Sequence, residues 1–205
     1  VERVWELLNV RYVVTWRSAL QVPSDVVYQS VTREGDEVYL HRLPDAAPRV
    51  WAVFQAEVAG REQIVERLSE PGLARRLALL EAPLAVPLSG EPERPAQLEL
   101  AAPSAERMLV RADMPARGLL VFSELYYPGW QARVDGQRVP IHRANGLLRA
   151  VEVPAGVHQI EMEYRPASVY GGMALSLLTC FLILGYTLFV VGTCLLYTSD
   201  AADEE

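Results

Sequence analysis

Three aromatic residues around a Pro-Gly pair are the feature of this sequence best suited to contacting a ligand. They are Tyr126, Tyr127 and Trp130. Aromatic rings have flat apolar faces and a polar edge, so these side chains could form a platform on which a sugar ring or a lipid headgroup stacks. The alternative is structural, because Trp130 begins a predicted strand and has the same parity as Val134, which favours a core position. If the chain is extended there, Tyr126 and Tyr127 point to opposite faces, so at most one of them can be core.

The acidic side chains nearest to these aromatics do not predict a catalytic pair. Glu124 and Asp135 flank the aromatic residues, and the two carboxyl groups of a glycosidase would have to lie about 5 to 10 Å apart. Asp135 is better explained by its neighbour Gly136, because Asp-Gly supplies the positive φ angles of a tight hairpin turn. We therefore predict no catalytic pair of carboxylates here.

No metal site or cofactor motif is evident either. His41, His142 and His158 do not share the spacing of metal ligands on one element. Cysteine occurs only in or beside the apolar C-terminal stretch, so neither a zinc site nor a disulfide framework is predicted. The glycines are isolated turn residues and do not form a phosphate-binding loop. We expect no metal and no cofactor.

Several arginines accompany the aromatic residues. Arg133, Arg138, Arg143 and Arg149 could give one sheet face a basic character that meets lipid phosphates or an anionic glycan. A solvated sheet face is the commoner meaning of such charges. The chain as a whole is acidic, with a formal net charge of -7, and no nucleic-acid partner is predicted.

The elements that carry these residues are predicted to be short antiparallel strands. From 158 to 165, apolar or aromatic residues alternate with charged or polar ones, which is typical of a strand with one buried face. Turn residues such as Asn145-Gly146 separate the strands. Seven strands at this spacing favour an antiparallel β-sandwich over residues 97–166. The predicted strands are 97–101, 108–112, 118–123, 131–134, 139–142, 147–153 and 158–165.

Residues 1–88 predict a small subdomain that contains both helix and strand, so the fold class of the whole chain is α+β. A hairpin is expected from 26–30 and 37–42 around a polar turn that contains a glycine. One strand over 49–58 is followed by a short amphipathic helix over 61–68. The Pro-rich residues 89–96 are predicted to link this subdomain to the sandwich.

An uncharged apolar stretch follows the sandwich. Residues 169–193 predict a transmembrane helix, since the apolar run 171–193 alone would be about 34 Å long as a helix and a bilayer core is about 30 Å thick. A buried core helix is the alternative, but no polar face appears at helical spacing. We therefore expect membrane lipid as a partner.

The C-terminal residues 194–205 are expected not to belong to the natural protein. The sequence CLLYTSDAADE resembles the translation of a transposase adapter used in sequencing libraries. Segments of this kind are excluded from reasoning about the fold. The chain also does not begin with Met, so we expect it to be truncated at both ends.

The sandwich sequence resembles a known family. The run LLVFSELYYPGWQARVDGQRVPIHRANGLLRAVEVPAGVHQIEMEYRP, followed by a membrane helix, is similar to the C-terminal region of the bacterial YfhO-like membrane proteins. Its most specific elements are YYPGW and the VDG that follows. LLNVRYVV, PRVWAV and REQIVERL in the first subdomain also resemble that family, in the same order, so the resemblance covers essentially residues 1–193.

The resemblance implies a function for the parent protein. Such proteins resemble large polytopic glycosyltransferases of the GT-C type that use polyprenyl-phosphate sugars, with this region outside the cytoplasm. The catalytic acid would lie between N-terminal membrane helices that this sequence lacks. The chain is thus expected to be a non-catalytic extracytoplasmic accessory domain at the bacterial cytoplasmic membrane, whose partners could include cell-envelope glycan or a polyprenyl-phosphate sugar. The alternative is a membrane-anchored scaffold module that binds cell-envelope glycan or a partner protein.

Overall fold

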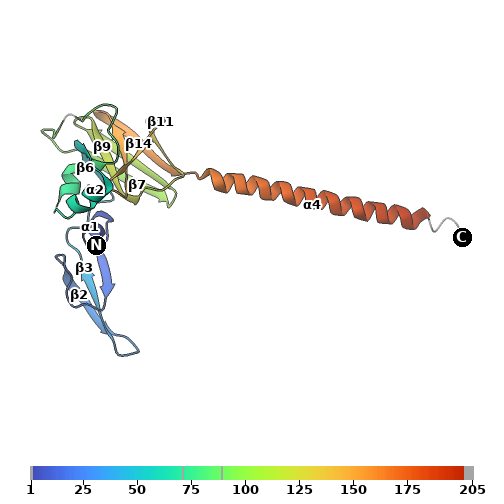
Figure 1. The fold of residues 1–205 in the computed structure, drawn as a ribbon, viewed down its shortest axis with the longest axis horizontal. Helices are drawn as coiled ribbons and strands as arrows, with labels where there is room; N and C mark the ends of the chain where they lie inside the picture. Colours follow the sequence, from blue (N-terminus) through green and yellow to red (C-terminus); the bar gives the residue numbers. More distant parts are fainter. Residues whose placement is uncertain (1, 71, 89, 201–205) are drawn as a thin grey trace. The chain divides into compact units, whose positions relative to one another are not determined.

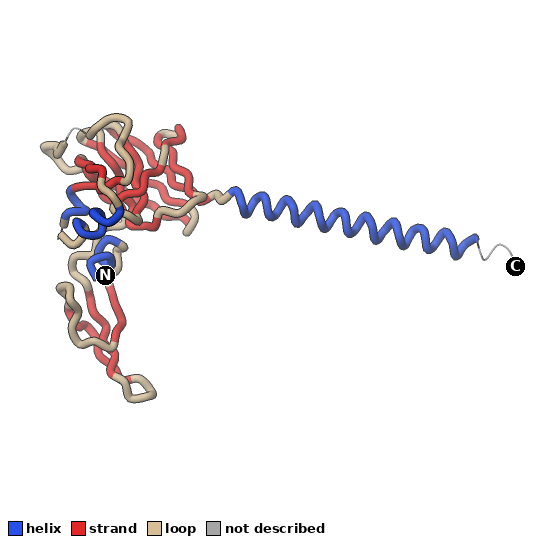
Figure 2. Tube along the Cα trace, viewed as in Figure 1, coloured by secondary structure: helices blue, strands red, loops and turns tan. Residues whose placement is uncertain are grey.

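The computed structural model describes residues 2–200 except 71 and 89, with the backbone alone for residues 2, 3 and 192–200. The chain divides into two compact units, Val1–Tyr164 and Arg165–Glu205. The first unit is built mainly from β-strands, and the second contains one long helix (Figures 1 and 2).

The strands of the first unit form three sheets. The three-stranded sheet has the order β1 (Tyr12–Thr15), β3 (Glu37–Arg42), β2 (Asp25–Val31). The five-stranded sheet has the order β11 (Gln137–Val139), β10 (Trp130–Val134), β14 (Gly156–Tyr164), β8 (Arg107–Met114), β7 (Gln97–Ser104). The six-stranded sheet has the order β4 (Val50–Val53), β9 (Gly118–Leu125), β13 (Leu148–Val153), β12 (Ile141–Ala144), β6 (Leu77–Leu80), β5 (Gln55–Val58). The strands pair antiparallel except β5 and β6, which are parallel.

The five-stranded and six-stranded sheets pack against each other through a shared apolar core. Every second side chain along β8 is buried, and Ile160 and Met162 are buried on one face of β14, as expected for strands with one face in a core. The same core takes residues from β4, β9 and β13 of the other sheet. The predicted β-sandwich in an α+β chain is therefore confirmed. The buried residues of this core are Val50, Phe54, Met108, Val110, Ala112, Met114, Leu120, Phe122, Ala132, Val134, Val151, Val153, Ile160 and Met162.

The central strands of the six-stranded sheet are buried on both faces. Strand β9 shows this most clearly, because all its residues from Gly118 to Ser123 are buried. Its second face joins another apolar cluster, which includes Leu7 of helix α1 (Glu2–Leu7) and Ala74 of helix α3 (Leu73–Arg76). A near-continuous apolar run is the sequence signature of a strand covered on both sides.

One residue brings the two ends of this sheet together. Strands β4 and β5 stand at opposite ends of the strand order, yet only Phe54 separates them in the sequence. The sheet must therefore curl until its first and last strands meet at Phe54. The second apolar cluster draws residues from all six strands, so it lies inside the curl.

Strands β5 and β6 are linked by a helical crossover, as parallel neighbours require. Helix α2 (Arg61–Arg67) and helix α3 lie between them in the sequence. At the start of α2, Gln63 Oε1 accepts a hydrogen bond from the Gly60 N–H at 3.1 Å. Ile64 on α2 is buried against Leu79 and neighbouring residues, which fixes the helix to the sheet.

In the structure, the predicted linker 89–96 does not separate two independent sheets. Strands β4, β5 and β6 come from the predicted α+β subdomain, residues 1–88, but they hydrogen bond into the sheet that contains β9, β12 and β13. Residues up to Tyr164 accordingly form one compact unit. The residues before and after the predicted linker therefore contribute strands to the same six-stranded sheet. Of the linker, residue 89 lies outside the described residues.

Two predicted strands are each split between different neighbours. The strand expected over 49–58 becomes β4 and β5, which pair with β9 and β6 respectively. The strand expected over 139–142 is divided at Pro140 into β11 and β12, which belong to different sheets. Proline has no N–H to donate to a sheet, so the chain changes sheets there.

The three-stranded sheet exposes a large apolar surface. Its hairpin β2–β3 forms around the predicted turn, with Gly35 at φ 94°. Tyr12 and Val14 on β1 and Tyr28 on β2 lie on one face and are 58%, 68% and 62% exposed. Strand β2 is exposed along its whole length.

The second unit consists of helix α4 (Ala167–Asp200). Its residues 167–191 form a candidate membrane span of 25 residues, none of whose described side chains is buried. The span begins two residues before the predicted helix and is long enough to cross a bilayer core of about 30 Å. The backbone of α4 continues beyond 193 to Asp200. The side chains of 192–200 and all of 201–205, and hence most of the expected adapter segment, lie outside the described residues.

Replacing Gly118 by alanine should destabilise the curled sheet. A Cβ atom at Gly118 would lie 2.9 Å from the Phe54 ring and 2.9 Å from the Val53 carbonyl oxygen, closer than real Cβ contacts. We expect Gly118→Ala to lower the free energy of unfolding by about 1 to 3 kcal/mol. Denaturant unfolding of the full chain in detergent, followed by tryptophan fluorescence, would measure this. Gly171→Ala is the control because nothing lies within 4 Å of its Cβ position; equal effects of both variants would contradict the packing at Phe54.

Candidate functional site

A tight turn at one end of the sandwich positions the three predicted aromatic residues. The turn falls on Pro128 and Gly129, between β9 and β10. Gly129 has a φ of 104°, which glycine adopts without strain, and proline before it is typical of such a turn. The turn therefore places Tyr126 and Tyr127 before it and Trp130 at the start of β10.

The ring of Trp130 is covered by a buried arginine. The guanidinium carbon of Arg149 lies 3.7 Å from the centroid of the Trp130 ring, which is a cation–π contact between the two sheets. Tyr164, the cross-strand partner of Trp130, lies 5.4 Å away between ring centroids. Trp130 is half-buried and packs against the sandwich core. Trp130 thus lies at the margin of the sandwich core, on the face that its strand parity predicts.

Arg149 is held by a carboxylate at the same end of the core. The residue is only 1% exposed, and its Nη2 donates a hydrogen bond to Glu124 Oε2. The other oxygen of Glu124 accepts a hydrogen bond from Arg49 Nη2 at 2.6 Å. Burial lowers the pKa of Arg149 from its usual value, while the charge of Glu124 opposes this effect. Both oxygens of Glu124 are therefore occupied by arginines, which leaves it poorly placed to act on a substrate.

The two tyrosines have different surroundings. Tyr126 is half-buried, and the guanidinium carbon of Arg143 lies 4.9 Å from its ring centroid. Tyr127 is 62% exposed and lies 6.4 Å from Tyr164 between ring centroids. Of the three predicted platform residues, Tyr127 presents most of its ring to solvent.

The four arginines proposed as a basic face are not brought together as one. Arg149 points into the core, so its predicted place on a solvated face is wrong. Arg143 contacts Tyr126 and lies 3.5 Å from Glu81, and Arg138 donates a hydrogen bond to Gln131 Oε1 at 2.6 Å. The strand pattern gave no sign that Arg149 is buried, because its partners Glu124 and Trp130 come from other strands.

Asp135 has a structural role at the end of β10 opposite to Trp130. With Gly136 it forms the predicted hairpin turn, at φ 50° and 79°. Its Oδ1 accepts a hydrogen bond from the Gln159 N–H at 2.8 Å, and its Oδ2 lies 2.6 Å from Nδ1 of His158. The Gln159 N–H, and then His158, lower the pKa of Asp135.

His158 lies between two hydrogen-bond acceptors. Its Nδ1 faces Asp135, and its Nε2 lies 3.2 Å from the Ala155 carbonyl oxygen. Only the imidazolium form can donate from both ring nitrogens. The hydrogen bond to Asp135 accordingly raises the pKa of His158. The pair ties the β10–β11 turn to the β13–β14 turn. In the described residues of the chain, no three His, Cys, Asp or Glu side chains are grouped as a metal site would require.

Comparison with known proteins identifies one family. The family model of the bacterial membrane protein YfhO matches residues 100–176. This range runs from β7 through the rest of the sandwich strands that follow it and into α4. The predicted resemblance is confirmed over these residues, and with the apolar helix it supports a role as a membrane protein. No curated protein and no solved structure gave a match to the chain.

Trp130 and Tyr127 should respond differently to truncation. Trp130→Ala removes a ring that packs between the sheets and should lower the free energy of unfolding by about 3 kcal/mol. Tyr127→Ala removes an exposed ring and should change it by no more than about 0.5 kcal/mol. Chemical denaturation of the full chain in detergent would compare them. Unchanged stability of Trp130→Ala would show that this ring is exposed and would restore it to the predicted platform.

The Asp135–His158 pair should make stability depend on pH. The pKa of His158 is raised, so its contribution is complete below the unfolded value of about 6.5 and is lost as pH rises through the folded pKa. The pKa of Asp135 is lowered, so its contribution is present above the unfolded value of about 3.9 and is lost as pH falls through the folded pKa. The pair is therefore most stabilising between these two limits.

An NMR titration of His158 in the full chain would check this expectation. Asp135→Asn should shift the pKa of His158 downward, because the carboxylate that favours the imidazolium is gone. His142 serves as the internal reference, since its contact is with Glu152. An unchanged pKa of His158 in Asp135→Asn would show that Asp135 does not raise the pKa of His158.

Proposed function

We propose that this chain is an extracytoplasmic accessory region of a polytopic membrane glycosyltransferase that uses lipid-linked sugars, and that it has no catalytic centre of its own. The observation that carries the proposal is the continuous match to YfhO from the sandwich into the helix α4. The glycosyltransferase activity and the location outside the cytoplasm come from the family resemblance stated above.

The geometry near the predicted aromatic residues supports a non-catalytic role. Both oxygens of Glu124 are engaged by Arg49 and Arg149. Asp135 is engaged by a backbone N–H and by His158. A general acid must be able to reach the atom that it protonates, and these two carboxylates are held by structural partners. In this proposal the sandwich positions a glycan acceptor or covers a membrane-embedded site elsewhere in the parent protein.

A second function is favoured by the three-stranded sheet. Tyr12, Val14 and Tyr28 present an exposed apolar face, and faces of this kind often mark interaction sites. The chain would then be a membrane-anchored scaffold that recognises cell-envelope glycan or a partner protein, independent of sugar transfer.

Sugar transfer distinguishes the two functions. The full chain, reconstituted in vesicles with a polyprenyl-phosphate sugar donor, should transfer no sugar. Removal of all residues from 1 to 164 from a longer protein that contains them should impair transfer and leave membrane insertion intact. The whole first unit is removed because strands from its N-terminal and C-terminal parts pair in the same six-stranded sheet. Transfer by the chain alone would overturn the accessory role, and full activity after the deletion would favour the scaffold.

A further inference from the structure

A cavity lies beside β5, the last strand in the order of the six-stranded sheet. Its volume is about 390 Å³, and all four residues of β5, Gln55–Val58, line it. Successive side chains of a strand point to opposite faces, so a cavity that touches all four residues reaches both faces of β5 around its edge. Leu77 and Leu80 of the neighbouring strand β6 also line it. We refer to this cavity as the β5 slot.

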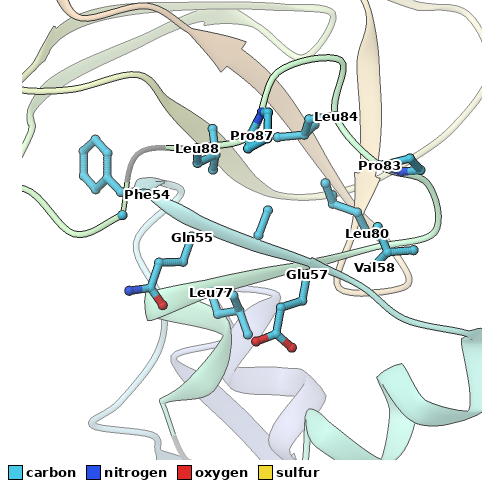
Figure 3. A pocket seen from close by; sticks show the side chains of 12 residues that line it. Phe54, Gln55, Glu57, Val58, Leu77, Leu80, Pro83, Leu84, Pro87 and Leu88 are labelled. Carbon is cyan, nitrogen blue, oxygen red and sulfur yellow. The ribbon is translucent and has the colours of Figure 1, made fainter.

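The opposite wall of the β5 slot is the Pro-rich segment. Pro83, Leu84, Pro87 and Leu88 line the cavity across from β5 (Figure 3). Leu84 and Leu88 also pack against the core inside the curled sheet, so the wall is anchored. The segment lies over the strand without filling the space between them.

The outer edge of β5 has no backbone partner among the described residues. β5 pairs with β6 on one side and ends the strand order on the other, and no backbone hydrogen bond from the described residues of the Pro-rich segment reaches it. Pro83 and Pro87 have no N–H with which to pair. An unpaired edge presents N–H and C=O groups that another extended chain can meet.

We propose that the β5 slot binds an extended polypeptide segment, which joins the six-stranded sheet as an additional strand next to β5. Backbone hydrogen bonds to the edge would supply affinity, as in other cases of strand addition. The ligand is a peptide because the unpaired groups are backbone N–H and C=O groups of β5. Their spacing along the edge matches that of the backbone groups of another strand.

The two sides of the β5 slot define the side chains that fit. Gln55 and Glu57 contribute polar groups to the lining, and Leu84, Pro87 and Leu88 contribute apolar ones (Figure 3). Glu57 is already paired with Arg67, so the polar side attracts no strongly charged partner. The matching segment alternates small polar and apolar residues and carries no net charge.

A five-residue peptide tests the backbone pairing directly. The probe is acetyl-Val-Ser-Val-Ser-Val-amide, added to the full chain in lipid nanodiscs, and hydrogen exchange of Gln55–Val58 is the measurement. The peptide should slow exchange there. Two N-methylated versions are compared, one methylated at the Val amides and one at the Ser amides, because the N–H groups of alternate residues point to opposite edges. One version should bind about tenfold or more weakly, since it loses backbone hydrogen bonds, and the other should bind like the parent. Equal binding of all three peptides, or binding of none, would overturn the proposal.

A matched pair of variants tests the position. Val58→Trp fills the slot, and Val65→Trp places the same ring on α2, outside it; the two valines are 57% and 70% exposed, so neither change should unfold the chain. Val58→Trp should abolish the protection, and Val65→Trp should keep it. Equal effects would overturn the proposal. So would protection of β5 that rises with chain concentration in the absence of peptide, because the occupant would then be a second copy.

Discussion

The central strands of the six-stranded sheet have both faces in apolar cores, and the arrangement of the other elements follows from covering them. The five-stranded sheet covers one face, and α1, α3 and the Pro-rich segment contribute to the other. The curl that brings β4 and β5 together at Phe54 is possible because the inner face carries many small side chains. Ala56, Ala78, Ala144 and Ala150 all lie there. Larger residues at these positions would crowd the inside of the curl.

The buried Arg149 links this architecture to the candidate site. Removing a guanidinium from water is costly, and a single hydrogen bond to Glu124 compensates only a fraction of that cost. The face of Trp130 supplies a further electrostatic contact in a place that water does not reach. Nε and Nη1 of Arg149 have no hydrogen-bond partner among the described residues. The aromatic turn is therefore held by an interaction between the sheets, and the shape of the surface near Tyr127 depends on the packing of the core.

Much of the fold could be predicted from the sequence where alternation was regular. The strand expected over 158–165 is β14, and the expected hairpin is β2–β3. Prediction failed where a strand changes neighbours. At Pro140 a signal existed, because proline cannot donate to a sheet. At Phe54 no signal existed, since the apolar pattern continues across it. The burial of Arg149 could not be predicted, because it depends on Trp130 and Glu124 arriving from other strands.

The pairing of β4 with β9 also constrains how the protein is made. β9 pairs in turn with β13, close to the C-terminal end of the first unit. A growing chain therefore exposes β4 long before β9 is synthesised, and β6 long before β12 is synthesised. The three-stranded sheet and the β5–β6 pair, whose contacts are closer in the sequence, can form earlier. The remaining apolar strands have to be kept from aggregating until Leu148–Val153 emerges, and folding that waits for distant contacts is intrinsically slow.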